Sequence, residues 1–358
     1  MTREGWRLTE EQWREWLDSL VRAGKRVIAP VAPPAGTRAL RLFQPVPSAD
    51  GVALDGYGNT RWSPKEFLFP NTETLFSYSF RGEDVQLEGP RTDEQEQVLF
   101  GVRPCDAAGL SRLDDVFLGG EDEDPFHADR RRRTTTISLA CDSARPQCFC
   151  TAVGGSPSGA EGSDLQLAPL DDAWLLHAVT EKGRNLIGDS AAGWTAASEA
   201  DWASADETRR AVERDIKHNP VPEEWAKALE STFGDSVWDT LGERCLSCGI
   251  CAYVCPSCSC FDVTDDGNAF CGTRCRTWDS CTFAGFTSHA SGHNPRGDQP
   301  ARYRQRVMHK FAYFPLQQGE SFMCVGCGRC TALCPVGIDI QHSLRSAVAA
   351  GAAGEGAS

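Results

Sequence analysis

Two stretches of the chain decide its fold: CLSCGICAYVCP at residues 245–256 and CVGCGRCTALCP at residues 324–335. Both have the spacing C-x2-C-x2-C-x3-C-P. Three cysteines at this spacing direct their sulfurs to one centre, whereas the fourth, next to proline, points away from it. A pair of such motifs therefore predicts two thiolate-ligated metal centres that exchange their fourth ligands.

This arrangement is typical of proteins that hold two [4Fe–4S] clusters. Cluster A is predicted to have four thiolate ligands: Cys245, Cys248, Cys251 and Cys334. Cluster B is predicted to be bound in the same crosswise manner by Cys324, Cys327, Cys330 and Cys255. Zinc is the alternative, but zinc sites usually combine two separated C-x2-C pairs, not a triplet followed by C-P.

The cysteine content and the charge limit the class of protein. Of the 17 cysteines, 13 lie between Cys245 and Cys334. The N-terminal segment MTREGWRLTEEQW lacks the apolar stretch of a secretory signal, so we expect a cytoplasmic protein whose cysteines bind metal. A net charge of −14 argues against binding to nucleic acid or anionic membrane. No apolar run approaches the roughly 20 residues that span a bilayer.

A chain of 358 residues is long enough for two or three domains. The patterns predict an α+β protein. Its expected parts are an N-terminal α/β domain (1–185), a helical connector (186–241), a ferredoxin-like domain with two [4Fe–4S] clusters (242–346, insertion 257–322) and a flexible tail (347–358).

Periodicity and capping residues predict several elements of the N-terminal half. Thr9 and Gln12 form a capping-box pattern at the start of an amphipathic helix. Leu165–Ala168 and Trp174–Ala178 are predicted to form a hairpin. Residues 198–219 and 222–241 have helical patterns, and 66–80 has no clear one.

Four further cysteines accompany a predicted βαβ unit. Strands 98–102 and 134–139 flank a helix that Asp106 is expected to cap, and a right-handed crossover makes these strands parallel neighbours. Ligands of open α/β sheets bind at the carboxyl edge. A third cluster is therefore one interpretation of the nearby thiols, and ordinary buried thiols are the other; they are Cys105, Cys141, Cys148 and Cys150.

The long insertion between the two motifs is locally basic. Between Cys271 and Lys310 it has a net charge of +5, which indicates either compensation of anionic clusters or a docking face. Cys258, Cys260 and Cys281 are expected to pack near a cluster, with ligation as the alternative. Hydrogen bonding to cluster sulfur is one interpretation of His293 and His309, and a structural role is the favoured one for each. The run 130–133, RRRR, is typical of a solvated face.

Several motifs together resemble a known family. In chain order they are FGVRPCD (100–106), CFC (148–150), CPSCSCFD (255–262), RTWDSC (276–281), GHNP (292–295), HKF (309–311) and CVGCGRC (324–330). This set resembles the beta subunit of cytoplasmic sulfhydrogenases, which are NADP-linked nickel–iron hydrogenases. It is also similar to the A subunit of anaerobic sulfite reductase. Cys271 and Cys275 are outside the pattern and are assigned no role.

The resemblance implies a non-catalytic electron-transfer subunit. Its expected partners are a flavin- and NAD(P)H-binding subunit and a catalytic hydrogenase subunit. The alternatives are the corresponding subunit of an anaerobic sulfite reductase and a zinc-stabilised interaction module. The chain has no G-x-G-x-x-G after a strand and no Walker loop, so the nicotinamide is expected to bind elsewhere.

Overall fold

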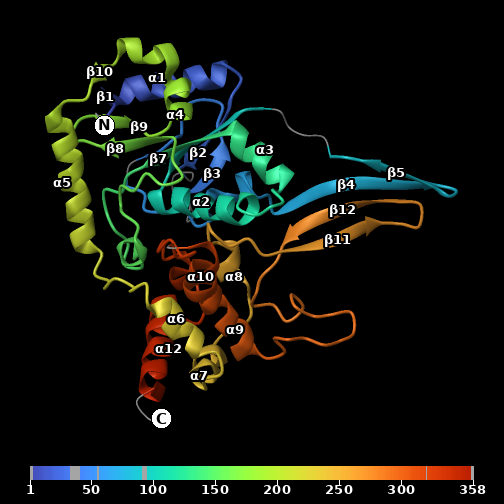
Figure 1. Ribbon diagram of the computed structural model, residues 1–358. Helices are drawn as coiled ribbons and strands as arrows, with labels where there is room; N and C mark the ends of the chain where they lie inside the picture. Colours follow the sequence, from blue (N-terminus) through green and yellow to red (C-terminus); the bar gives the residue numbers. More distant parts are fainter. Residues whose placement is uncertain (1–2, 33–40, 55, 91–94, 320, 356–358) are drawn as a thin grey trace. The chain divides into compact units, whose positions relative to one another are not determined.

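The computed structural model describes residues 3–32, 41–54, 56–90, 95–319 and 321–355 (Figure 1). The chain divides into two compact units, each assembled from separate stretches. The first unit comprises Met1–Leu68, Gln95–Val221 and Cys324–Gly328. The second comprises Phe69–Glu94, Pro222–Met323 and Arg329–Ser358. The second cysteine motif is therefore shared, because its first two cysteines belong to the first unit.

An eight-stranded sheet forms the centre of the first unit, in the order β10-β1-β9-β8-β7-β6-β2-β3. Its parallel core is β2-β6-β7-β8, and the outer strands pair antiparallel. The strands are β1 (Gly5–Leu8), β2 (Arg26–Val31), β3 (Leu42–Pro45), β6 (Gln97–Val102), β7 (Thr134–Leu139), β8 (Leu165–Pro169), β9 (Trp174–Ala178) and β10 (Thr195–Ala196). The predicted parallel pair β6–β7 and the hairpin β8–β9 are confirmed.

Helices cover both faces of this sheet, with α1 above and α2 below the strands in Figure 1. Thr9 caps α1, and its hydroxyl accepts from the Gln12 amide, as the capping box predicts. The apolar stripe of α1 is buried in the core cluster of the sheet. The helical elements of this unit are α1 (Glu10–Arg22), η1 (Pro64–Phe67), α2 (Pro104–Leu118), α3 (Pro125–Arg133), η2 (Cys150–Val153), α4 (Glu181–Ile187), η3 (Gly188–Gly193) and α5 (Glu199–Asp215).

The start of α2 differs from the prediction. Asp106 was expected to cap the helix, but α2 begins at Pro104 and Arg103 is the N-cap residue. Proline is favoured in the first turn because it has no amide hydrogen to satisfy there and its φ is already helical. Cys105 therefore lies within the first turn of α2, directly after β6, and Asp106 is fully buried.

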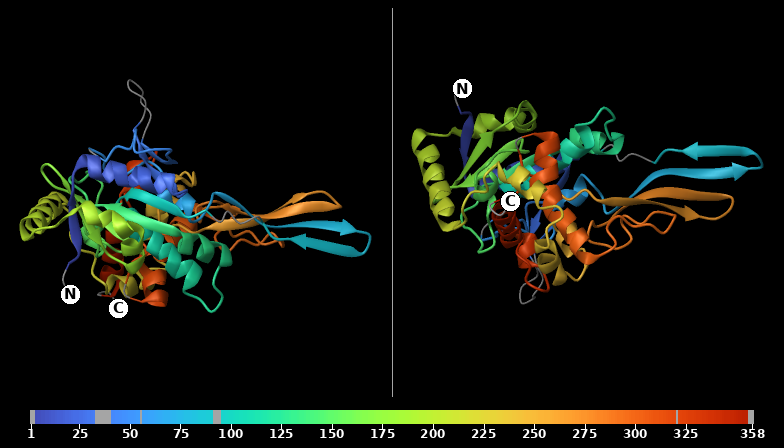
Figure 2. Two further views of the ribbon diagram at one scale, coloured as in Figure 1. Left: turned by 90° about the horizontal axis from the view of Figure 1, so that it is seen from above. Right: turned by 60° about the horizontal axis from the view of Figure 1, so that its bottom comes forward.

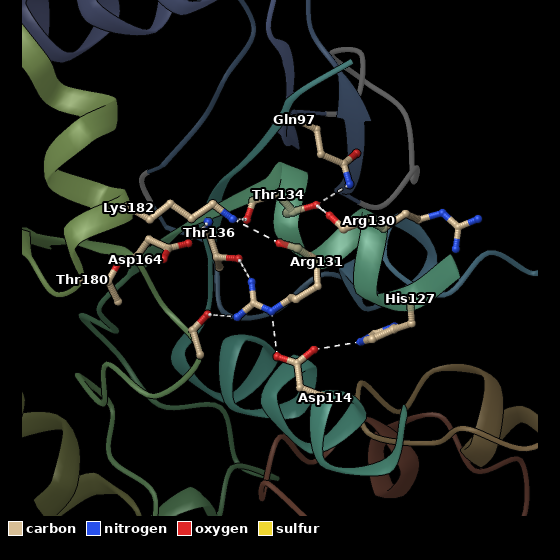
Figure 3. Close-up of polar contacts among 11 residues, drawn as sticks. Gln97, Asp114, His127, Arg130, Arg131, Thr134, Thr136, Asp164, Thr180 and Lys182 are labelled. Carbon is tan, nitrogen blue, oxygen red and sulfur yellow. Dashed lines mark hydrogen bonds and ion pairs between the residues drawn. The ribbon is translucent and has the colours of Figure 1, made fainter. Parts of the chain in front are cut away.

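A polar network connects α2, α3 and α4 to the first residues of β7 (Figure 3). Arg131 Nε donates to Asp114 Oδ2 at 2.7 Å, and Asp114 Oδ1 lies 2.8 Å from His127 Nε2. Lys182 Nζ donates to the carbonyl oxygens of Arg131 (3.1 Å) and Thr134 (2.5 Å). The interpretation of residues 130–133 as a solvated face is therefore wrong at Arg131, whose side chain joins two helices.

Two hairpins build the four-stranded sheet of the second unit, in the order β11-β12-β4-β5. All its pairings are antiparallel, and Figure 2 shows the two hairpins side by side. The strands are β4 (Thr72–Arg81), β5 (Asp84–Glu88), β11 (Phe261–Gly267) and β12 (Cys271–Trp278). Residues 66–80, which had no clear pattern, thus contain the end of η1 and most of β4.

Short helices form the rest of the second unit, and α12 packs against α6, α7 and α9. They are α6 (Trp225–Ser231), α7 (Val237–Glu243), α8 (Ile250–Tyr253), α9 (Gln299–Met308), the π-helical turn η4 (His309–Tyr313), α10 (Phe314–Gln318), α11 (Arg329–Ala332) and α12 (Ile340–Glu355). The flexible tail expected at 347–358 is instead helical to Glu355, and residues 356–358 lie outside the described part. Among the described helices, none has the length and apolar character needed to cross a bilayer.

Candidate iron–sulfur centres

The cysteines predicted for cluster A share one cavity in the second unit. Its lining contains Cys245, Cys248, Cys251 and Cys334. Cys330 borders the same cavity, so five thiols face a space for which four ligands are needed. The three cysteines of the triplet lie just before and at the start of α8, and Cys334 follows α11.

The remaining lining of this cavity is mostly apolar: Leu246, Gly249, Ile250, Thr282, Tyr303, Arg306, Pro335, Val336, Ile338 and Ile340. Apolar walls on the buried side leave the thiolates as the dominant donors, although Cys248 is exposed; a thiolate donor set of this kind is what a [4Fe–4S] cluster requires. The donor set and its surroundings therefore fit this group.

Arg306, on α9, is the buried cation at this cavity and is 3% exposed. Its Nη2 donates to the carbonyl oxygen of Cys251 at 3.1 Å, and its Nη1 donates to Cys258 Sγ at 3.8 Å. Although burial opposes ionisation, the neighbouring thiolates, Cys251 first, hold the pKa of Arg306 well above its ordinary value. A permanent positive charge thus stands beside ligands that become anionic when they bind iron.

A second group of thiols surrounds Lys310, which is also 3% exposed. Lys310 Nζ lies 3.4 Å from Cys255 Sγ and 3.2 Å from Ser257 Oγ. A hydrogen bond from Cys258 holds the pKa of the Cys255 thiol well below its usual range. In the same way, a hydrogen bond from Cys281 lowers the pKa of Cys260. The hydrogen bond and the Lys310 ammonium both favour the thiolate of Cys255, which is the form that ligates metal.

The first two cysteines of the second motif, Cys324 and Cys327, lie in a loop of the first unit that contacts the Cys148–Cys150 segment. The amide of Phe149 donates to the carbonyl of Gly326 at 2.9 Å. Asn59 Nδ2 donates to the carbonyl of Cys327 at 2.8 Å. A Cβ added at Gly326, where φ is +66°, would lie 2.5 Å from the backbone of Cys150. The loop with Cys324 and Cys327 is thus seated directly on the Cys148–Cys150 segment.

Three of the four N-terminal cysteines interact electrostatically. Burial raises the pKa of Cys141 to about 11, with Cys148 contributing, and that of Cys150 to about 12, with Cys141 and Cys148 contributing. Cys141 follows β7 and Cys105 follows β6, so both stand at the carboxyl ends of neighbouring parallel strands. Cys141, Cys148 and Cys150 are thus close enough to interact, and Cys105 shares the carboxyl end of the sheet with Cys141.

Comparison with known proteins agrees with this geometry. Residues 244–338 match the model of a 4Fe–4S dicluster domain. Over 334 residues, covering 93% of this chain and 95% of the relative, the sequence is 32% identical to sulfhydrogenase 2 subunit beta of Pyrococcus furiosus. The chain belongs to the sulfhydrogenase beta-subunit family. The family resemblance and the α+β fold class are confirmed, and the protein is an iron–sulfur protein of electron transfer.

The ligand assignments of this sulfhydrogenase-beta homologue stay predictions at the level of single residues. For cluster A, the four expected cysteines line one cavity. For cluster B, Cys324 and Cys327 belong to the first unit, and Cys330 and Cys255 to the second. In the described residues, no three His, Cys, Asp or Glu side chains are placed to hold a single metal ion.

Sequence analysis missed two contributors to the sites of this sulfhydrogenase-beta homologue. Arg306 and Lys310 were noticed only as part of a basic insertion, and the structure shows that both contact cysteine sulfur. Other arginines of the insertion have different roles: Arg276 forms a buried ion pair with Glu73, and Arg274 an exposed one with Asp265. Only some basic residues of the insertion, such as Arg306 and Lys310, are therefore placed to compensate the charge of cysteine thiolates.

Proposed function

We propose that this chain relays single electrons between a flavin- and NAD(P)H-binding subunit and a catalytic hydrogenase subunit. The proposal rests on the cavity that is lined by Cys245, Cys248 and Cys251 of one motif and by Cys334 of the other. Iron–sulfur clusters, when bound, accept and release one electron at a time. The sulfhydrogenase relative, a beta subunit by name, supports the same kind of assembly for this chain.

The residues around the cavity have a clear task in such a relay. Apolar side chains form most of the wall around the thiolates, and Arg306 offsets part of their negative charge. A buried positive charge near a cluster favours its reduced form, because reduction adds a negative charge in a low-dielectric region. We therefore propose that Arg306 raises the reduction potential of cluster A.

Anaerobic affinity purification of the tagged chain from its native host tests the relay. We expect a flavoprotein and a nickel–iron subunit to be recovered with it. Recovery of a sirohaem subunit in place of the nickel–iron one would reject the hydrogenase assignment in favour of sulfite reduction. Recovery of the chain alone, colourless and with zinc, would reject electron transfer altogether.

A matched pair of variants then tests the role of cluster A. Cys248→Ser is expected to retain the partner subunits but to lose the iron of one cluster, about four atoms per chain, together with NADPH-dependent reduction of the catalytic subunit. Cys271→Ser removes an exposed cysteine of β12 and should change neither quantity. Equal electron transfer in the two variants would contradict the relay.

We also propose a third cluster in the first unit, bound by Cys105, Cys141, Cys148 and Cys150. Its support is the electrostatic interaction of Cys141, Cys148 and Cys150, the place of Cys105 after the neighbouring strand β6, and the contact of this segment with the loop of Cys324 and Cys327. Such a position would extend the relay into the first unit. Cys148→Ser should lower the iron content while the electron paramagnetic resonance signals of clusters A and B persist, and an unchanged iron content would reject this site.

A further inference from the structure

Among the cysteines of the second unit without a role in the proposed relay are Cys258, Cys260 and Cys281. They line one cavity together with Ser259, Arg306, His309, Lys310 and Met323. Cys258 and Cys281 are buried, with 8% and 7% exposure. The cavity is therefore a distinct place in the second unit, separate from the one that the cluster A cysteines surround.

The charges at this cavity favour anionic ligands. Two cations that are each 3% exposed, Arg306 and Lys310, border it. Burying a cation costs several kcal/mol unless an anion lies close by. Arg306 Nη1 is 3.8 Å from Cys258 Sγ, so sulfur is its neighbour on this side. Thiolates around a metal centre supply the negative charge that protonated thiols lack.

The thiols are also mutually close. Cys281 is hydrogen-bonded to Cys260, and Cys258 interacts electrostatically with Cys260. They come from two segments: Cys258 and Cys260 precede β11, and Cys281 follows β12. His309 opens the π-helical turn η4, and such turns frequently occur at functional sites because they reorient a side chain within a helix. The hairpin and the turn thus bring four potential ligands to one cavity.

We propose that Cys258, Cys260, Cys281 and His309 bind a further iron–sulfur cluster. Histidine replaces cysteine as a ligand in some iron–sulfur clusters, so the mixed donor set is chemically reasonable. A single ion is disfavoured, since no three such side chains of the described residues are placed to hold one. This inference goes beyond the proposed relay, and it leaves Cys255 to cluster B.

The position of this cluster has a consequence for electron flow. Arg306 borders both this cavity and the cavity of cluster A. Lys310 borders the cavity and contacts Cys255 Sγ at 3.4 Å. The same two cations thus connect the further cluster with cluster A and with a predicted ligand of cluster B. The second unit would then hold one more one-electron centre within reach of the relay.

The double variant Cys260→Ser/Cys281→Ser tests the site by metal content and spectroscopy in the anaerobically prepared full chain. We expect it to lose about two irons if the cluster is [2Fe–2S] and about four if it is [4Fe–4S], while the resonance signals of clusters A and B persist. The matched control is Cys271→Ser/Cys275→Ser, which removes two cysteines of β12 and should keep all the iron. Unchanged iron in the test variant, or loss of zinc in its place, overturns the proposal.

A second measurement covers the case in which the double variant fails to fold. In the Cys148→Ser chain, the proposed N-terminal cluster is absent, so clusters A and B account for about eight irons. More than eight irons with matching acid-labile sulfide supports the further cluster, and eight or fewer overturns it. Cys248→Ser reports separately on the relay, so failure of one proposal is distinguishable from failure of the other.

Discussion

Gly326 shows how a single residue governs the contact between two cysteine loops. Its φ is +66°, and a Cβ there would meet the backbone of Cys150 at 2.5 Å and of Phe149 at 2.5 Å. Any other residue at this position would have to adopt a left-handed backbone conformation, and its Cβ would push the two loops apart. Only glycine satisfies the two conditions, which explains its place between Cys324 and Cys327.

Gly326→Ala is expected to loosen this contact. The left-handed conformation alone costs about 1–2 kcal/mol, and the clash with backbone atoms adds to it. Thermal unfolding and iron content of the anaerobic protein measure the effect. The control is Gly154→Ala, because Gly154 has a φ of +81° but nothing within 4 Å of its added Cβ. If both variants lose equal stability, the close approach of Gly326 to Cys150 contributes nothing to the stability of the protein.

His177 on β9 predicts a pH dependence of stability. Burial lowers its pKa from the ordinary value of 6.5, and Arg3 and Arg184 contribute in the same direction. The ring packs edge-on against Trp202, with centroids 5.2 Å apart. Below pH 6.5 the unfolded chain therefore binds a proton that the folded chain resists, so stability is present above this value and declines as the pH falls.

Urea unfolding from about pH 7 to about pH 5 checks this prediction. In His177→Phe the decline should be shallower than in the wild-type chain, since an aromatic ring remains against Trp202 but no longer titrates. Clusters that dissolve in acid affect both proteins equally and cancel in the comparison. Parallel pH profiles for the two proteins would show that His177 contributes nothing to the decline.

At the scale of elements, β4 and β12 are joined by a buried ion pair. Arg276 and Glu73 have side chains that are each 4% exposed, and the Arg276 guanidinium also lies 5.3 Å from the ring centroid of Phe69. β4 comes from a stretch nearly 200 positions before β12, so this pair links distant parts of the chain. Backbone hydrogen bonds join β4 to β12, and Arg276 lies directly opposite Glu73 in the register of these two strands.

Glu73→Gln is expected to destabilise the protein by about 3 kcal/mol, because it leaves a buried guanidinium without its carboxylate. Chemical denaturation measures the loss. Asp265→Asn removes the exposed pair between Arg274 and Asp265 in the same sheet and should have a much smaller effect, since solvent screens that pair. Equal losses for the two substitutions would mean that burial does not set the contribution of the Glu73 pair.

At the scale of the whole molecule, the two units are interleaved along the chain. The second unit takes its β4–β5 hairpin from Phe69–Glu94, and the first unit takes Cys324–Gly328 from the second cysteine motif. A fragment of residues 222–358 therefore retains both motifs but lacks β4, one of the two strands that pair with β12. It also lacks the Phe149 and Asn59 contacts of the Gly326 loop.

We expect the 222–358 fragment to be poorly soluble and to bind fewer than the about eight irons expected for clusters A and B in the intact protein. Soluble yield and iron content after anaerobic expression measure this. The intact chain prepared in parallel is the reference. A soluble fragment that keeps about eight irons would show that the dicluster domain is independent of the rest of the chain.

Local patterns predicted the elements whose determinants are close together in sequence. The capping box of Thr9, the parallel strands β6 and β7 and the hairpin β8–β9 are all confirmed. The helix that Asp106 was expected to cap begins three residues earlier than predicted, and α12 continues where a flexible tail was expected. Both errors arise at helix ends, where capping and packing outweigh composition. The β4–β12 pairing lay beyond local patterns because its strands are distant in sequence.

The cysteine spacing by itself determined that this is an iron–sulfur protein, because three thiolates two residues apart are brought to one centre by the loop that carries them. Only the tertiary structure decided which thiols share a cavity, that Arg306 and Lys310 contact sulfur, and that Arg131 joins two helices. Burial and charge neighbours are set by segments far away along the chain. A sequence motif describes only its own loop, whereas the environment of a cluster belongs to the folded molecule.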